Sequence, residues 1–284
     1  MQTILRSKTK TVKIDPNGPF TIIGEKINPT GRKKLAAALQ EGNFDYVREL
    51  AAKQIAGGAD VLDVNVGVPG LDDVAVLPQV VQLLGEEFDI PLCIDTPNPK
   101  ALEAALKVAP GRVLVNSVNG EESSLSNVLP LVKEYNAAVI GLVMDENGIP
   151  NDPETRCAIA EKIIERAARL GIPIEDIVID VLVLTVGADS NAAAVTLKTI
   201  ELVRKNFGVN INLGASNVSF GLPDRDTLNM AFLGLAIHAG ASCAITDPTK
   251  YTAFIKGCDL LMGRDAYAAK YIKYFRTHPV EEKK

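Results

Sequence analysis

Small acids and amides recur at the ends of apolar runs along the chain. The residues at or just after the carboxyl ends of these runs are Glu25, Asp63, Asn65, Asp95, Asn116, Asp145, Asp180, Asn217 and Asp247. Any one of them could cap the helix that follows. Capping does not explain four of them, which lie within or directly after an apolar run, several residues before a helix can begin: Asp63, Asp95, Asn116 and Asp180. The set is better explained as the polar floor of one binding cavity.

The elements that must position these residues are strands and helices in alternation. The apolar runs cover residues 20–25, 60–65, 91–96, 112–117, 138–145, 176–181, 211–216 and 242–247. Apolar positions with helical spacing lie between them, in residues 44–55, 100–108, 152–170, 192–206 and 224–239. Such alternation predicts right-handed crossovers and a parallel sheet, and eight units favour a closed (β/α)8 TIM barrel in a single domain. A doubly wound open sheet is the alternative.

A TIM barrel would bring all of these polar residues to one place. The carboxyl ends of its eight strands converge on one rim, where the loops build the active site. We expect the barrel to span residues 20–276, with an N-terminal extension of residues 1–19 and a polar C-terminal tail of residues 277–284.

Composition excludes several classes of partner. The chain has 284 residues, 47% of them hydrophobic and 23% charged, which is enough for a large core. A net charge of −5 gives no basic field for nucleic acid. No signal sequence and no apolar segment of the roughly 18 residues that a membrane span needs can be found, so we expect a cytoplasmic protein. The four cysteines are scattered without a CxxC pair and are interpreted as reduced core thiols.

The types of side chain present argue against several kinds of catalysis at the rim. The two histidines, His238 and His278, do not stand at strand ends, so they form no metal site and activate no nucleophile there. No GxSxG motif is present, which argues against triad hydrolysis. We predict no metal, although magnesium bound by Asp63, Asp95 and Asp180 remains an alternative. A Schiff base on Lys26 is a second, weaker one, because Lys26 follows the first strand instead of lying on it.

A flat, uncharged heterocycle fits the rim better than these alternatives. A carboxylate can accept bonds from a ring N–H and the adjacent exocyclic amine together, and an asparagine serves a neighbouring carbonyl and N–H. A 2-amino-4-oxopteridine has this pattern along one edge. Other nitrogen heterocycles satisfy the same argument.

Five motifs carry a resemblance to a known family. They are GEKINPTG (24–31), GADVLDVNVG (58–67), CIDT (93–96), VNSVN (115–119) and GASNVS (214–219). In order and spacing they resemble the pterin-binding barrel family from about residue 20 to about residue 276. Within it the chain is most similar to the methyltetrahydrofolate:corrinoid protein methyltransferases and to the folate-binding domain of cobalamin-dependent methionine synthase. Dihydropteroate synthases carry a Ser-x-Lys element after the seventh strand, and its absence here favours the methyltransferases.

The resemblance implies roles for individual residues. Asp95, Asn116 and Asp180 match the residues that bind the pterin edge. Asn217 matches the residue that reaches N5 of the folate. Positions near the pocket are matched by Asp63, Asn65, Asp145, Ser219 and Arg225. Two departures concern the surroundings: Val181 follows Asp180 where the family usually has proline, and Phe220 replaces a polar residue of some relatives.

The resemblance also implies a reaction and partners. A methyl group would move between N5 of tetrahydrofolate and the cobalt of a corrinoid, with Asn217 hydrogen-bonding N5. The proton would come from water through a network that includes Asp95 or another rim carboxylate. The chain lacks the Asp-x-His-x-x-Gly motif of corrinoid modules, so we expect cobalamin to arrive on a separate corrinoid protein that docks at the barrel mouth. Relatives are homodimers, which we expect here too. The alternatives are a dihydropteroate synthase-like condensing enzyme and a non-catalytic folate-binding subunit.

Overall fold

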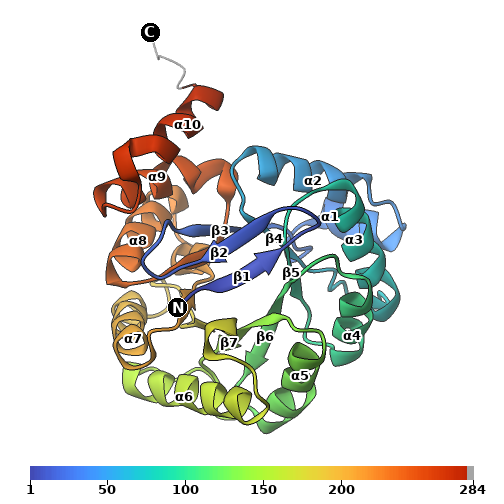
Figure 1. Cartoon of the computed structure of the whole chain (residues 1–284), viewed down its shortest axis with the longest axis horizontal. Helices are drawn as coiled ribbons and strands as arrows, with labels where there is room; N and C mark the ends of the chain where they lie inside the picture. The colour runs from blue at the N-terminus through green and yellow to red at the C-terminus, as the bar shows by residue number, and fades with distance from the viewer. Residues whose placement is uncertain (280–284) are drawn as a thin grey trace.

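A ring of parallel strands surrounded by helices forms the body of the molecule (Figure 1). The computed structural model describes residues 1–279, and the expected tail therefore lies partly outside the described residues. The ring comprises β3 (Thr21–Ile27), β4 (Val61–Val64), β5 (Leu92–Asp95), β6 (Leu114–Asn119), β7 (Ala138–Leu142), β8 (Ile177–Asp180), β9 (Asn210–Asn212) and β10 (Cys243–Thr246). Bonds from Ser242 N to Ile211 O (3.0 Å) and from Ile245 N to Leu213 O (2.8 Å) join β9 to β10 and close the ring. The predicted (β/α)8 barrel is confirmed.

Helices connect the strands on the outside of the ring. They are α1 (Lys33–Gln40), α2 (Asp45–Ala56), α3 (Asp73–Glu87), α4 (Pro99–Val108), α5 (Glu122–Glu134), α6 (Pro153–Arg169), α7 (Ala192–Phe207), α8 (Arg225–Ala239), α9 (Pro248–Leu261) and α10 (Ala269–Thr277). Short 3₁₀ turns are η1 (Ile174–Asp176), η2 (Ala215–Ser219) and η3 (Ala266–Ala268). Asp247 accepts a bond from Thr249 N and caps α9, so for this member of the predicted rim the capping interpretation holds.

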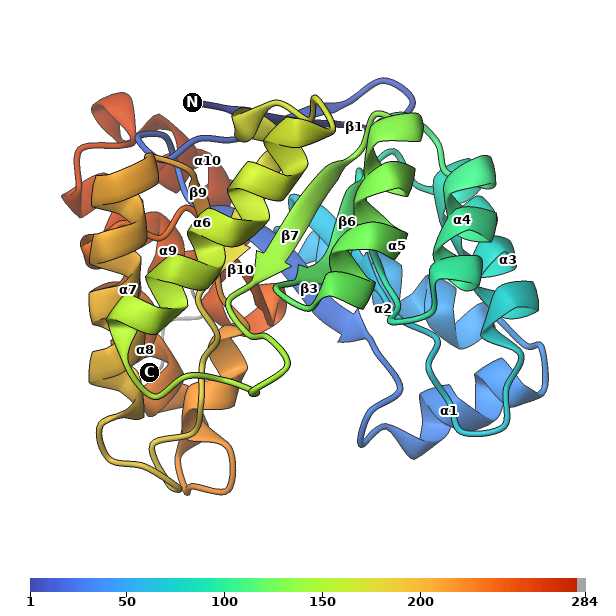
Figure 2. The ribbon, with the colours of Figure 1, turned by 90° about the horizontal axis from the view of Figure 1, so that it is seen from below.

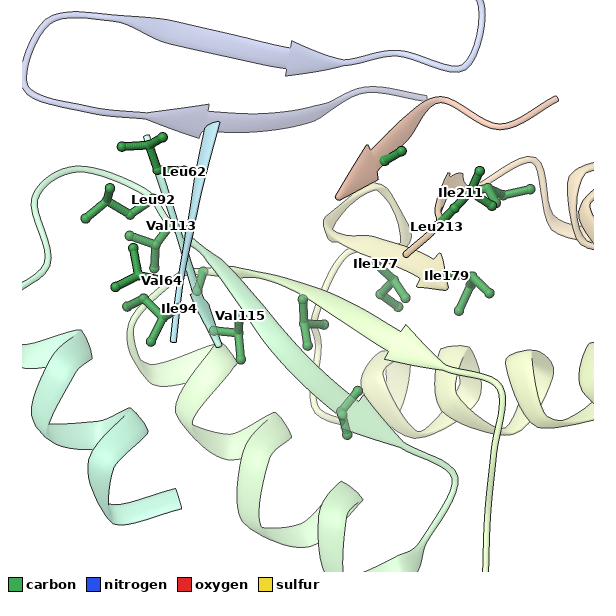
Figure 3. Close-up of a cluster of buried hydrophobic side chains, with 14 of the residues drawn as sticks. Leu62, Val64, Leu92, Ile94, Val113, Val115, Ile177, Ile179, Ile211 and Leu213 are labelled. Atoms are coloured by element: carbon green, nitrogen blue, oxygen red, sulfur yellow. The ribbon is translucent and has the colours of Figure 1, made fainter. Parts of the chain in front are cut away.

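Two apolar clusters account for the strand sequences. The outward side chains of the strands pack against the helices, and Figure 3 shows part of this outer cluster, with Leu62, Val64, Leu92, Ile94 and Val115 among its residues. The inward side chains form a second cluster, which includes Ile23, Val61, Cys93, Leu114, Ala138, Ile140, Val178 and Cys243. Because both faces are buried, the strands read as nearly continuous apolar runs. The polar rim residues are exceptions to that pattern.

A β-hairpin closes one end of the barrel. The extension of residues 1–19 contains β1 (Thr3–Arg6) and β2 (Thr11–Ile14), which pair antiparallel. The hairpin adds Leu5, Val12 and Ile14 to the inner cluster. Asn210 Nδ2 of β9 donates to Thr3 Oγ1 and to Ile14 O, each at 2.9 Å, and ties the hairpin to the ring. Figure 2 shows the hairpin at the end from which the strand arrows point away, so it covers the amino ends of the strands.

Helix α8 lies against the barrel, and its Phe232, Leu233, Ala236 and Ile237 are buried. At the end of the described chain α10 extends away from the barrel (Figure 1), and none of its residues is buried. No helix within residues 1–279 is both long and apolar enough to cross a membrane.

Candidate functional site

A cavity of about 410 Å³ lies at the carboxyl ends of the strands. It is lined by Glu25, Asn28, Thr30, Arg32, Asp63, Asp95, Asn116, Gly214, Ser216, Asn217, Arg225 and Ile245. Five of the nine residues expected at the site are therefore brought together: Asp63, Asp95, Asn116, Asn217 and Arg225. The other four, Asn65, Asp145, Asp180 and Ser219, do not line it.

Strand alternation explains how the polar floor is built. Val61 belongs to the inner apolar cluster and Leu62 to the outer one, so Asp63 faces inward, one layer above Val61. The same alternation places Asp95 above Cys93 on the next strand. In the parallel register Asp95 lies opposite Asn116 of β6. Three neighbouring strands thus contribute one polar side chain each to the layer that faces the cavity.

Hydrogen bonds orient these three side chains. Asn116 Nδ2 donates to Asp63 Oδ1 at 3.2 Å. Asn65, although outside the cavity, donates from Nδ2 to Asp95 Oδ2 at 2.9 Å and so fixes that carboxyl group. Within residues 1–279 no other side chain donates to Asp95 Oδ1, which leaves this oxygen for a ligand.

Both carboxyl groups have raised pKa values. Burial raises the pKa of Asp63 well above its ordinary value, and the charge of nearby Asp95 raises it further. Burial also raises the pKa of Asp95, to about 6, against the opposing effect of the bond from Asn65. With a pKa of about 6, Asp95 is mostly ionised near neutral pH and can accept charge-assisted bonds from a ligand.

Asp180 is buried, and each of its carboxylate oxygens accepts a bond from the protein. Its Oδ1 accepts from Leu182 N at 2.8 Å, and its Oδ2 accepts from Asn212 Nδ2 at 2.6 Å. Burial raises the pKa of Asp180 to about 6. The loop that follows, where Val181 stands in place of proline, is fixed by the buried Arg156, whose Nη1 donates to Val181 O (2.8 Å) and Leu182 O (2.9 Å). Each carboxylate oxygen of Asp180 keeps one acceptor site beyond these bonds, but Asp180 does not line the cavity.

Asn217 lies on the turn η2, directly after β9. Its main chain bonds to Gly214 and Phe220, while within residues 1–279 its side-chain amide, which lines the cavity, bonds to no other protein group. Hydrogen bonds fix the turn on both sides of Asn217. Ser216 Oγ donates to Glu25 Oε2 at 2.8 Å, and Ser219 Oγ donates to Asn229 Oδ1 at 2.7 Å. The amide is thus held at the cavity wall with its hydrogen-bonding capacity available to a ligand.

Arg225 holds this turn as well as lining the cavity. Its Nη2 donates to Ser216 O at 2.7 Å and its Nε to Ser219 Oγ at 3.0 Å, on either side of Asn217. Its guanidinium carbon lies 5.9 Å from the ring centroid of Phe220, an exposed aromatic residue beside the cavity. Ser219, fully buried, therefore supports the turn and does not reach the cavity.

Asp145 has a local role. Its Oδ1 accepts from Asn147 N at 2.9 Å, and its main chain pairs with Gly148, so it shapes the turn after β7. Lys26, considered from sequence as a Schiff-base residue, is ion-paired with Asp247 Oδ2 at 2.6 Å and with Glu25 Oε1 at 3.0 Å.

Several lining residues were missed from sequence. Asn28, Thr30 and Arg32 come from the loop between β3 and α1, in or next to the motif GEKINPTG, and Ser216 lies in the motif GASNVS. These motifs were the available signal for them, whereas Glu25 of β3 already belonged to the predicted rim. Loop residues beyond a strand end could not be placed in the cavity without knowing how the loop folds.

Comparisons with known sequences agree with this geometry. The model of a family described as pterin binding enzyme matches residues 24–247. A methylcorrinoid:tetrahydrofolate methyltransferase of Eubacterium limosum is 31% identical over 263 residues, which cover 90% of this chain and 96% of the relative. The methionine synthase of Mycobacterium tuberculosis is 31% identical over 242 residues, which cover 81% of this chain but 20% of that longer protein.

Solved structures show the same fold. A dihydropteroate synthase of Yersinia pestis with a pterine-sulfa conjugate superposes with a TM-score of 0.70 at 16% identity, covering 92% of this chain and 99% of the other. The 7,8-dihydropteroate synthase of Vibrio fischeri gives a TM-score of 0.69 at 17% identity, covering 92% and 99%. At these identities the likeness concerns the fold alone. From the family match and the methyltransferase relative, we conclude that this chain belongs to the family of pterin-binding enzymes.

Proposed function

We propose that the chain is a methyltransferase that moves a methyl group between N5 of tetrahydrofolate and the cobalt of a corrinoid carried by another protein. The observation that carries this proposal is the uncommitted amide of Asn217 on the wall of a cavity whose floor holds Asp95 and Asn116. The methyltransferase relative, similar over nearly its whole length, supports the same reaction.

The pterin ring is bound along its amide edge in this proposal. The ionised carboxylate of Asp95 accepts bonds from the ring N3–H and the 2-amino group, and charge-assisted bonds of this kind are about twice as strong as neutral ones. Asn116 donates from Nδ2 to Asp63, and its side-chain carbonyl oxygen accepts from a ring N–H. A cavity of about 410 Å³ is of the size that holds small ligands. Asp180 completes the edge with the acceptor sites that its bonds to Leu182 and Asn212 leave free.

The chemical step depends on N5. As the bond between N5 and the methyl carbon breaks, its electron pair stays on N5 and takes up a proton, while cobalt(I) supplies the pair for the new bond to carbon. Asn217 hydrogen-bonds N5 and stabilises the transition state because this bond strengthens as the charge on N5 changes. The proton comes from water through a network that includes Asp95 or another carboxyl group of the rim. The reverse reaction uses the same contacts.

The corrinoid supplies the methyl acceptor or donor and is delivered by a partner at the barrel mouth. The open side of the cavity lies at the carboxyl ends of the strands, and the hairpin of residues 1–19 covers the opposite end. Docking at the mouth would bring the cobalt over N5. A homodimer, expected from the resemblance, leaves both mouths accessible if it forms through the outer helices.

Two assays test the proposal. Calorimetry should show binding of 5-methyltetrahydrofolate, with an affinity that falls at least tenfold in Asp95→Asn and stays within about twofold in Asp145→Asn, the matched control outside the cavity. A spectrophotometric assay with a corrinoid protein should then show methyl transfer. Binding without transfer would leave a non-catalytic folate-binding subunit, and absence of binding would overturn the proposal.

A condensing activity of the dihydropteroate synthase type is the alternative. It requires a pterin diphosphate and aminobenzoate, and the described lining of the cavity contains Arg32 and Arg225 but no lysine at the position after β9. Incubation with the dihydropterin diphosphate and aminobenzoate should give no dihydropteroate. Formation of dihydropteroate at a rate comparable to methyl transfer would favour the alternative.

A further inference from the structure

A chain of hydrogen bonds leads away from the Asn217 turn into the space between α8 and α9. Ser219 Oγ donates to Asn229 Oδ1 at 2.7 Å, and Asn229 Nδ2 donates to the hydroxyl oxygen of Tyr251 at 2.9 Å. The Tyr251 hydroxyl donates to Asp226 Oδ1 at 2.7 Å. Ser219, Asn229 and Tyr251 are 0%, 3% and 3% exposed, so the two bonds that join them are shielded from water, whereas Asp226 at the end of the chain is half-exposed.

All donors in this chain point the same way. It begins at the guanidinium of Arg225, which donates to Ser219 Oγ, and it ends at the carboxylate of Asp226, which Lys250 Nζ also contacts at 2.9 Å. A chain that runs from a cation to an anion is polarised along its length, and each bond strengthens the next. Burial raises the pKa of Tyr251 to about 12, so its hydroxyl remains a donor throughout the neutral range.

The chain has no contact with the expected pterin edge. Asp95 and Asn116 are on β5 and β6 and are fixed by Asn65 and Asp63. Tyr251 is on α9 and touches neither the cavity nor its carboxylates. The turn η2 is short, and the bond from Ser219 to Asn229 anchors the end of it that lies two residues beyond Asn217.

We propose that Tyr251 is a positioning residue for the methyl-transfer step, acting through Asn229 and Ser219 to hold the amide of Asn217 in line with N5. This inference rests on the proposed function. Without the hydroxyl of Tyr251, Asn229 Nδ2 loses its acceptor and can rotate away from Ser219, which frees the turn. Because residues on other strands bind the pterin edge, removal of the Tyr251 hydroxyl should lower the rate of methyl transfer and leave the affinity for folate unchanged.

The experiment compares Tyr251→Phe with wild type and with Asn217→Ala in single-turnover methyl transfer at saturating 5-methyltetrahydrofolate. We expect Tyr251→Phe to slow transfer roughly 10- to 100-fold, as misplacement of a reacting group does. The dissociation constant of folate should stay within about twofold. In the double variant, Tyr251→Phe should cause no further loss beyond that of Asn217→Ala, since it acts through the same amide.

Two further variants keep the test decisive. Tyr274→Phe removes a tyrosine hydroxyl at the opposite end of the molecule, beside Lys10 of the hairpin, and should leave the rate unchanged. Asp226→Asn changes a half-exposed group that weakens the chain without threatening the fold, and should slow transfer several-fold. It replaces Tyr251→Phe as the decisive variant if the latter does not fold, as judged by thermal unfolding.

Three results would overturn the inference. They are an unchanged rate in Tyr251→Phe, a loss of folate affinity as large as the loss of rate, and a further loss in the Asn217→Ala background. A wild-type protein that transfers no methyl group contradicts the proposed function itself, which is a different outcome from an active wild type whose Tyr251→Phe variant behaves additively.

Discussion

Asp63 and Asp95 lie on neighbouring strands and differ in their access to water. Asp63 is 2% exposed and accepts a bond from Asn116, whereas Asp95 is half-buried and accepts from Asn65. Both pKa values are raised, first of all by burial, and that of Asp95 is raised to about 6. Near neutral pH the cavity floor therefore carries the charge of the Asp95 carboxylate. A buried charge lowers the stability of the folded protein. Functional sites commonly keep such destabilising groups because activity requires them, and we interpret the Asp95 carboxylate in this way.

Asp95→Asn should make the protein more stable and the ligand bind more weakly. A carboxyl group with a raised folded pKa binds protons more tightly in the folded state, so its stabilising effect is complete below about pH 4 and lost as the pH rises through about 6. The amide carries no charge and keeps the acceptor for Asn65. We expect the unfolding free energy near pH 7 to rise by about 1–2 kcal/mol, with the gain vanishing below about pH 4. Denaturant titrations at two pH values check this, and a constant difference at both would contradict it.

The affinity for folate should depend on pH through the same group. Asp95, with a pKa of about 6, must be ionised to accept two donors from the pterin edge. We expect the dissociation constant of 5-methyltetrahydrofolate to rise as the pH falls below about 6, approaching a tenfold change for each pH unit. Calorimetry across this range measures the effect, and the dependence should disappear in Asp95→Asn.

At the scale of elements, the turn η2 follows strand β9 and positions Asn217 at the cavity wall. Its entry is Gly214, where a Cβ atom would lie 3.1 Å from Asn217 Nδ2. This contact is tighter than most real Cβ contacts, and the amide is the group that can yield. The glycine thus leaves space for the asparagine side chain, and the bonds from Ser216 and Ser219 fix the turn on both sides.

Gly214→Ala tests whether the place of this amide matters. Gly214 has φ −78°, so alanine adopts the backbone without strain, and we expect a change in unfolding free energy below about 1 kcal/mol. The methyl group should displace the Asn217 amide and slow methyl transfer about tenfold or more. Single-turnover kinetics with thermal unfolding as the control measure both quantities. Unchanged kinetics would show that the amide has no fixed place.

Elements differed in how well sequence could predict them. The barrel strands were predictable because both their faces are buried, so each is an apolar run broken by the inward acid or amide. The hairpin of residues 1–19 was not, because each strand has four residues and its order comes from packing on the barrel end. At the site, Asp95 and Asn116 follow from strand alternation and a motif. The hydrogen bond between Asp180 and Asn212 could not be predicted from sequence, because it joins side chains of two different strands.

At the scale of the whole molecule, the barrel interior is sealed at one end and polar at the other. Leu5, Val12 and Ile14 of the hairpin complete the apolar cluster beneath Cys93 and Cys243, and the layer above these residues is the cavity floor. The apolar layer separates the site from the amino ends of the strands. Stability and ligand binding are therefore expected to respond to different parts of the interior.

Leu5→Ala tests this division. Leu5 is fully buried, and removal of a buried leucine side chain typically costs about 2–5 kcal/mol of unfolding free energy. We expect a loss in this range in denaturant unfolding, with the affinity for 5-methyltetrahydrofolate unchanged within about twofold under conditions where the variant is folded. A folded variant with strongly weakened folate binding would show that the hairpin supports the site directly.

The most direct test of the account is the rate of methyl transfer between 5-methyltetrahydrofolate and a corrinoid protein in the Asn217→Ala variant at saturating folate. The rate, followed through the absorbance of the corrinoid, should fall roughly 10²- to 10³-fold, the usual effect of removing one preorganised group at a reacting atom. The dissociation constant of folate should change by no more than a few-fold. A rate within a few-fold of wild type would contradict the role of Asn217, and a wild-type protein that binds folate without transferring its methyl group would contradict the proposed reaction.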